Sequence, residues 1–308
     1  LYVSSSTVGD DMLYKSLKFA GDPAQGGKVN LTKAKHGCIA DKGFTFQAWL
    51  EPLNRKAETT TIFEVGGEYS IRMNNDNILV LMGATLEQVR SYKLESSIAQ
   101  NSFFHLTVAY NLDKELKIFI NGVAKDSVTL TNNFTCSFTE TTKCVIANNT
   151  DDNVTNKLPY NGIIDDVRLW NKSISNFDAT DNYNRYIGGT ETGLIGYWPM
   201  DEGIGTYAFD CSKTDKVFNE CHITDIKKAT SESIVPKKEQ LSIKGVTDAS
   251  GNYIIRGIPF TGDGSTYTVT PVMGTHKFEP KQQLRYISPS SLVHNSTDFV
   301  DKSSFPVL

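Results

Sequence analysis

The sequence predicts an all-β protein, an antiparallel jelly-roll sandwich followed by a smaller β-sandwich domain. Three observations lead to this fold class. Short runs of β-branched and aromatic residues recur along most of the chain, often alternating with polar residues. Turn residues separate these runs at short intervals, and only one segment has a helical pattern. Many short strands with almost no helix are typical of sandwiches and jelly rolls.

The clearest strands lie in the first two thirds of the chain. Residues 44–50 alternate in the way expected of a strand, and residues 105–110 and 116–120 are further runs of apolar and β-branched residues. Asn121 and Gly122 follow directly, and this pair favours a type I′ turn that leads into the next strand.

One helix is expected, over residues 173–183. Either Ser173 or Ser175 is a suitable N-cap, because a serine hydroxyl can accept a hydrogen bond from the first turn of a helix. The segment is short, so it adds little to an otherwise all-β fold.

Length and composition limit the classes of protein. A chain of 308 residues suggests two domains at roughly 100–200 residues each. The net charge of −4 offers nothing basic to follow a phosphate backbone, which argues against nucleic acid as a partner. No apolar run approaches the roughly 18 residues of a membrane span, so no membrane insertion is expected. Because the chain begins with Leu1, we expect a processed or excised fragment.

The five cysteines leave two alternatives open. Cys136 and Cys144 flank a polar stretch between two strand-like runs, which suits a disulfide across a hairpin. Cys211 and Cys221 would close a similar loop. The other alternative is five free, partly buried thiols, including Cys38.

A change in composition divides the chain near residues 234–240, where a proline and a run of charged residues suggest a linker. We therefore expect a large domain over residues 11–236 and a small one over residues 237–308.

Several stretches in the large domain together resemble the laminin-G-like (concanavalin A-like) jelly roll. The match includes the motif GIIDDVRLWN at residues 162–171, with the expected helix after it, and then GLIGYWPMDEGIG at residues 193–205. The resemblance covers roughly residues 11–236 and implies an extracellular or cell-surface binding module. The remaining matching stretches are residues 17–21, 44–52, 104–110 and 116–123.

The C-terminal part resembles the carboxypeptidase-regulatory-like (prealbumin-like) β-sandwich, through Gly245, Asp248, Gly251 and Tyr253. That family normally has a strand pair before this motif, and none lies directly upstream here. Residues 1–3 form a strand with no evident place in a jelly roll. The resemblance therefore implies that these residues complete the small domain and that the jelly roll is inserted into it.

Catalytic residues are not evident. Glycan-hydrolysing jelly rolls need two facing carboxylates, and retaining members carry them as Glu-x-Asp-x-x-Glu, a spacing that this sequence lacks. Glu64 and Glu68 flank two glycines and are expected on a turn, and His105 is expected to be a packed strand residue. The sequence therefore indicates a protein that is not an enzyme.

Asp165 is the main candidate site residue. It has the same strand parity as Val167 and Leu169, so its carboxylate would point into the core and need a partner. The resemblance implies a Ca²⁺ site where the first and last strands meet, and Asp22 and Asp165 match it, although Ala20 replaces the family's usual Asp. The alternative is a structural hydrogen bond from Asp165 to nearby backbone or to Arg168.

The function that best fits these features is a non-catalytic extracellular binding or adhesion module for glycan or protein, acting through a rim or a concave face. Trp49, Trp170 and Trp198 are candidates for stacking on sugars, although packing in the sandwich is the commoner role of such residues. One rival is a purely structural spacer that contacts neighbouring repeats of a long surface protein. A glycoside hydrolase is the other.

Overall fold

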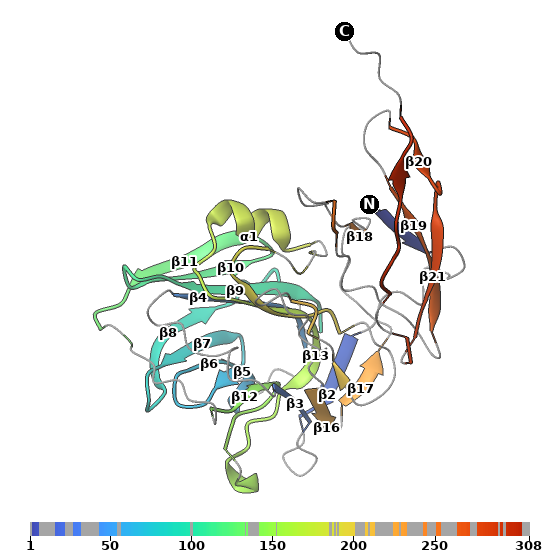
Figure 1. The fold of residues 1–308 in the computed structure, drawn as a ribbon. Helices are drawn as coiled ribbons and strands as arrows, with labels where there is room; N and C mark the ends of the chain where they lie inside the picture. The colour runs from blue at the N-terminus through green and yellow to red at the C-terminus, as the bar shows by residue number, and fades with distance from the viewer. Residues whose placement is uncertain are drawn as a thin grey trace.

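The computed structural model is all-β with antiparallel sheets, and its described residues include one short α-helix, which confirms the predicted fold class (Figure 1). Two eight-stranded sheets form the jelly roll, and a smaller four-stranded sheet follows. The residues that the structure describes are 2–5, 16–21, 27–31, 43–53, 57–98, 101–132, 134, 142–151, 153–184, 187, 189, 191–200, 207–208, 210–212, 224–227, 229–232, 243–244, 251–253, 264–271, 276–288, 290–291 and 294–303.

The first sheet of the jelly roll, sheet 1, has the strand order β11-β10-β9-β4-β13-β2-β17, and β14 also pairs with β13. Its strands are β2 (Ser16–Ala20), β4 (Phe44–Pro52), β9 (Phe104–Tyr110), β10 (Glu115–Ile120), β11 (Val123–Thr129), β13 (Asn161–Trp170), β14 (Leu194–Trp198) and β17 (Ala229–Glu232).

The second sheet of the jelly roll, sheet 2, has the strand order β15-β16-β3-β12-β5-β6-β7-β8. Its strands are β3 (Lys28–Leu31), β5 (Thr60–Val65), β6 (Tyr69–Asn74), β7 (Asn77–Met82), β8 (Glu87–Lys93), β12 (Cys144–Ile146), β15 (Tyr207–Ala208) and β16 (Thr224–Lys227).

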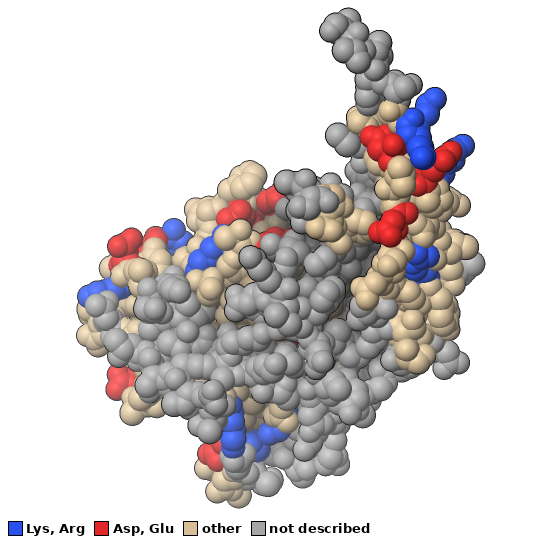
Figure 2. All heavy atoms as spheres, in the orientation of Figure 1, with Lys and Arg blue, Asp and Glu red and all other residues tan. Residues whose placement is uncertain are grey.

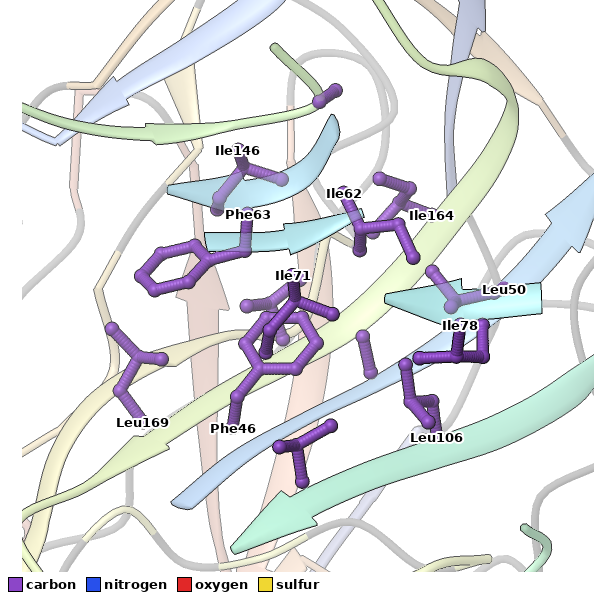
Figure 3. Packing of buried hydrophobic residues seen from close by; sticks show 14 of the residues in the cluster. Phe46, Leu50, Ile62, Phe63, Ile71, Ile78, Leu106, Ile146, Ile164 and Leu169 are labelled. Atoms are coloured by element: carbon purple, nitrogen blue, oxygen red, sulfur yellow. The ribbon is translucent and has the colours of Figure 1, made fainter. Parts of the chain in front are cut away.

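Aromatic and branched side chains from both sheets fill the space between them (Figure 3). Phe46 of sheet 1 stacks on Phe63 of sheet 2 with ring centroids 5.1 Å apart, and Phe44 stacks on Tyr69 at 4.2 Å. Offset ring pairs of this kind add to the stabilisation from buried apolar area.

At one margin of the sandwich, the edge strands β8 and β11 are joined by ion pairs. The guanidinium of Arg90 donates from Nε and Nη2 to the two carboxylate oxygens of Asp126, at 2.5 and 2.7 Å. Lys125 pairs with Glu95 beside it, at 2.8 Å. Two charge pairs therefore tie sheet 1 to sheet 2 where their edges meet.

The local predictions for the hairpin and the helix are confirmed. Asn121 and Gly122 have φ angles of 50° and 74°, as a type I′ turn requires, and Ile120 pairs with Val123 across it. Helix α1 (Asn176–Asn182) is shorter than the predicted segment and begins after Ser175, which forms a capping box with Asp178. A further short helical element among the described residues is the 3₁₀ helix η3 (Val154–Asn156).

The small sheet has the strand order β18-β1-β19-β21. Its strands are β1 (Tyr2–Ser5), β18 (Ile243–Lys244), β19 (Ser265–Thr270) and β21 (Gln283–Ile287), and β20 (Phe278–Glu279) pairs separately with β22 (Val300–Asp301). The N-terminal strand thus pairs with C-terminal strands, as the insertion prediction expects; the boundaries at residues 236 and 237 stay predictions.

Cys144 is a free, buried thiol in this structure, which argues against the suggested disulfide with Cys136. Cys38, Cys136 and Cys221 themselves lie outside the described residues.

The core predicts a clear contrast between two phenylalanines. Phe46→Ala removes a fully buried ring and should lower the free energy of unfolding by about 3–5 kcal/mol. Phe177→Ala, at a residue that is 76% exposed, should change it by less than about 0.5 kcal/mol. Chemical denaturation of the two variants measures both values, and equal losses would contradict the assigned core.

Candidate ligand-binding face

The outer face of sheet 1 is covered. Helix α1 lies over this face (Figure 1), and a second apolar cluster packs beneath it. Trp49 and Trp170 are 7% and 3% exposed, and Trp198 is 1% exposed, so none of the three tryptophans is available for stacking on a sugar. The residues of this cluster are Ala109, Phe119, Trp170, Ile174, Ala179, Ile187, Leu194 and Tyr197.

Asp165 lies at a β-bulge in β13. It is fully buried as predicted, but the prediction that it points into the core is wrong. Asp165 pairs with Trp49 and Arg168 pairs with Gln47, so β13 has one more residue than β4 between these pairs. Asp166 takes a left-handed conformation with φ of 52°. The extra residue reverses the alternation, and the register places Asp165 opposite Trp49, on the outer face of sheet 1.

The bulge creates a buried ion pair below the helix. Arg168 donates to both carboxylate oxygens of Asp166, at 2.6 and 2.9 Å, and both side chains are fully buried. Burial is the largest single influence and lowers the pKa of the Arg168 guanidinium. The charge and hydrogen bond of Asp166, together with the charges of Tyr197 and Glu191, outweigh it, so the pKa is raised. The carboxylate that contacts Arg168 in this way is that of Asp166, the neighbour of the predicted residue.

The same guanidinium also holds α1 in place. Arg168 Nη1 donates to the carbonyl oxygen of Asn182 at 2.8 Å, and Trp49 Nε1 donates to that of Tyr183 at 3.0 Å. These carbonyls at the C-terminal end of the helix lack partners within the helix, so two buried donors from sheet 1 complete its hydrogen bonding. The bulge region is therefore a structural support for the helix.

The described part of the structure does not show the two predicted calcium ligands, Asp22 and Asp165, close together. Asp22 lies outside the described residues, and Gly21 before it packs against Asn161, at the opposite end of the β2–β13 pairing from Asp165. Within the described ranges, no three His, Cys, Asp or Glu side chains lie close enough together to hold a metal ion. The calcium site stays a prediction.

Breaking the buried pair should cost much more than removing both partners. Arg168→Leu leaves the Asp166 carboxylate buried without its cation, so the free energy of unfolding should fall by about 3–5 kcal/mol. Asp166→Asn keeps a residue that tolerates positive φ. The double variant should lose less than the sum of the two single losses, as measured in a double-mutant cycle; strict additivity would show that the pair is not coupled.

Sheet 2 has an outer face of a different character. Strand register places Glu64, Ser70 and Leu81 in one row across this face, and Arg72 and Leu79 in the next. The rows end on β8 at Gln88 and Ser91, both of which are exposed. The face therefore changes from buried at β5 to open at β8, with polar side chains at its open margin.

Glu64 is the functional candidate that sequence reasoning missed. It lies within β5 and is almost fully buried, whereas a turn was expected. One of its carboxylate oxygens accepts from Arg72 Nη2 and Ser70 Oγ, and the other accepts from the backbone N–H and the hydroxyl of Thr150, all at 2.9 Å. The alternation of residues in this strand would have predicted the outward position of Glu64, because Phe63 and Val65 on either side of it face the core.

Thr150 belongs to a polar loop, residues 147–158, that projects beyond β12 and β5 (Figure 1, the yellow-green loop at the bottom). The carboxylate of Asp151 accepts hydrogen bonds from the backbone N–H of Asn153 and from the side-chain amide of Asn156. These bonds lower the pKa of Asp151, and the bond from the Asn153 backbone has the larger effect. Asn153 in turn accepts from the backbone and hydroxyl of Thr155. The loop thus holds exposed amide and hydroxyl groups in fixed positions beside the outer face of sheet 2.

The described surface on the side drawn in Figure 2 has no basic face. Figure 2 shows acidic and basic residues interspersed among the described residues on the side drawn. No described helix is both long and apolar enough to cross a membrane.

Comparison with known proteins places the large domain in a family. The laminin G-type model of the concanavalin A-like lectin/glucanases superfamily matches residues 24–178, half of the chain. The chain therefore belongs to the concanavalin A-like lectin/glucanases superfamily, and the predicted resemblance of its large domain is confirmed. No curated protein sequence matches the chain.

Solved structures are similar to this chain at low sequence identity. A candidate carbohydrate-binding protein from Bacteroides ovatus is 14% identical with a TM-score of 0.55, over 74% of this chain and 62% of that one. A SAP-like pentraxin from Limulus polyphemus is 14% identical with a TM-score of 0.42, over 56% and 82% of the two chains. Botulinum neurotoxin type C is 15% identical with a TM-score of 0.44, over 71% and 57%.

Burial of a thiol in this sandwich predicts a pH dependence. Desolvation, with Glu68 and Glu64 adding to it, raises the pKa of Cys144 well above its ordinary value of 9.0. In the unfolded chain the Cys144 thiol ionises near its ordinary pKa, whereas in the folded chain it stays protonated. The contribution of the protonated thiol to stability is therefore fully present below pH 9.0 and is lost as the pH rises above it.

Between pH 9 and 10 the wild type should therefore lose up to about 1.4 kcal/mol per pH unit relative to Cys144→Ala. Denaturation at several pH values measures the difference. Parallel curves for the two proteins would mean that the thiol titrates alike in both states.

Proposed function

We propose that this chain is a non-catalytic, extracellular binding module that recognises glycan through the outer face of sheet 2 and the loop of residues 147–158. The observation that carries the proposal is the contrast between the two faces. The outer face of sheet 1 is closed by α1, whereas the outer face of sheet 2, on which Leu79 and Leu81 are buried, exposes Gln88 and Ser91 at its β8 margin.

The chemistry of this surface suits a ligand rich in hydroxyl groups. Arg72 is held by Ser70 and Glu64 and is still 17% exposed, so its guanidinium has a fixed orientation on the face. Amide and hydroxyl groups of Asn153, Thr155 and Asn156 lie on the adjoining exposed loop. Loops on a rigid sandwich are a common place for binding specificity. Membership of a superfamily that includes lectins supports the same class of ligand.

The catalytic alternative has less support. Glu64 is paired with Arg72, and Asp166 is paired with Arg168. Asp210 accepts two backbone N–H groups, from Tyr197 and Ser212. These three buried carboxylates therefore have structural partners, whereas a glycosidase needs two facing carboxylates free to act on the sugar.

A glycan array screened with the full chain tests the proposal. The variant Gln88→Ala/Asn156→Ala should weaken binding to any glycan hit at least tenfold, because it removes an exposed amide from the face and another from the loop. Asn176→Ala, at an exposed residue on α1, is the matched control and should bind as the wild type does.

The other outcomes separate the rivals. Loss of binding with a chelator would support the predicted calcium site at Asp22 and Asp165. Equal weakening by the control variant would place the ligand elsewhere. No binding to glycans or to matrix proteins would favour a spacer, and release of new reducing ends would revive the hydrolase.

A further inference from the structure

The small sheet contains a strand from the far end of the sequence. Strand β1 is a central strand, paired on one side with β18 and on the other with β19. Val3 lies opposite Ile243 in one neighbour and Val269 in the other. The N-terminal strand is thus enclosed by C-terminal strands.

The jelly roll lies between β1 and β18 in the chain, and its own ends meet. Strand β2, the first of its described strands, pairs antiparallel with β17, the last, and Ser16 lies directly opposite Glu232. The chain therefore enters and leaves the jelly roll at one place. Because β1 and β18 are also antiparallel neighbours, they form a β-hairpin whose connection is the whole jelly roll.

The first and last described segments of the chain lie at the other end of the small sheet. Tyr2 lies opposite Thr270, at the end of β19 beside Gln283. Residues 296–298 run back along β21: Thr297 accepts from Arg285 at 2.8 Å, and the carbonyl of Asp298 accepts from Gln283 at 2.6 Å. They lead to β22 and β20 beyond that end, and Figure 1 shows β20 on this upper side of the sheet.

From this topology we infer that the small sheet is a mount for the jelly roll, joined to it by two chain connections, one after β1 and one before β18. It holds the jelly roll as a side branch at one end and keeps the outer parts of the chain at the opposite end. A partner bound by the jelly roll is then held at the end of the small sheet that lies away from the first and last described residues. The inference concerns strand topology, so it stands or falls independently of the proposed glycan ligand.

A cross-link in the full chain tests the mount. Ser4 and Thr268 are directly opposite, so Ser4→Cys/Thr268→Cys should form a disulfide. A specific protease site inserted after residue 238 then allows one cut between the jelly roll and β18. On a non-reducing denaturing gel the cut protein should still run as one chain of 34.1 kDa, and reduction should separate the two fragments.

Two controls use the same cut. Ser4→Cys/Thr266→Cys places the cysteines on a diagonal, about 7–8 Å apart, and should separate without reduction. The chain with only its native cysteines should also separate. If the opposite pair fails to link while the diagonal pair links, or if neither links, β1 is not held at this register and the inference is wrong.

A distance measurement tests the arrangement of the ends. Spin labels introduced through an unnatural amino acid at Tyr2 and Lys302 should lie closer together than labels at Ser5 and Lys302. Three residues of strand separate the two N-terminal positions, roughly 10 Å. A shorter Ser5 distance would place the chain ends on the jelly-roll side and overturn the inference.

Discussion

The jelly roll depends on an interruption in its longest described strand, the bulge at Asp165 and Asp166 in β13. Before the bulge β13 pairs with β2, and after it with β14, while β4 lies along its other side throughout. An extra residue is what lets one strand keep apolar side chains in the core on both halves and still turn Arg168 outward. That arginine then holds the helix that closes sheet 1.

Because the outer face of sheet 1 is covered, the outer face of sheet 2 is the candidate binding surface. Polar side chains on the outer faces of both sheets bond to one another, and on sheet 1 they also bond to the helix. Gln47, for example, accepts from Trp170 and donates to Thr107 beneath that cover. On sheet 2 the corresponding positions end in exposed residues on β8. The asymmetry between the faces is therefore a product of the bulge, the arginine and the helix acting together.

Sequence reasoning predicted what is local and missed what depends on pairing. The Asn121–Gly122 turn and the Ser175 cap were predictable because backbone conformation and capping are set by a few adjacent residues. The orientation of Asp165 was not, because the bulge arises from pairing with strands that are distant in sequence. The same limit applies to Glu64: its parity was visible, but its bond to Thr150 joins residues 86 positions apart.

The ion pairs between β8 and β11 have a consequence beyond joining the two sheets. Edge strands expose unpaired backbone groups that can recruit strands from other molecules, and charged side chains are a common defence against such aggregation. The two edge strands at this margin, β8 and β11, carry that defence, with Arg90 and Asp126 engaged across the gap and Lys125 and Glu95 beside them. Where many copies of such a sandwich lie close together, these ion pairs would hinder pairing between the edge strands of neighbouring molecules.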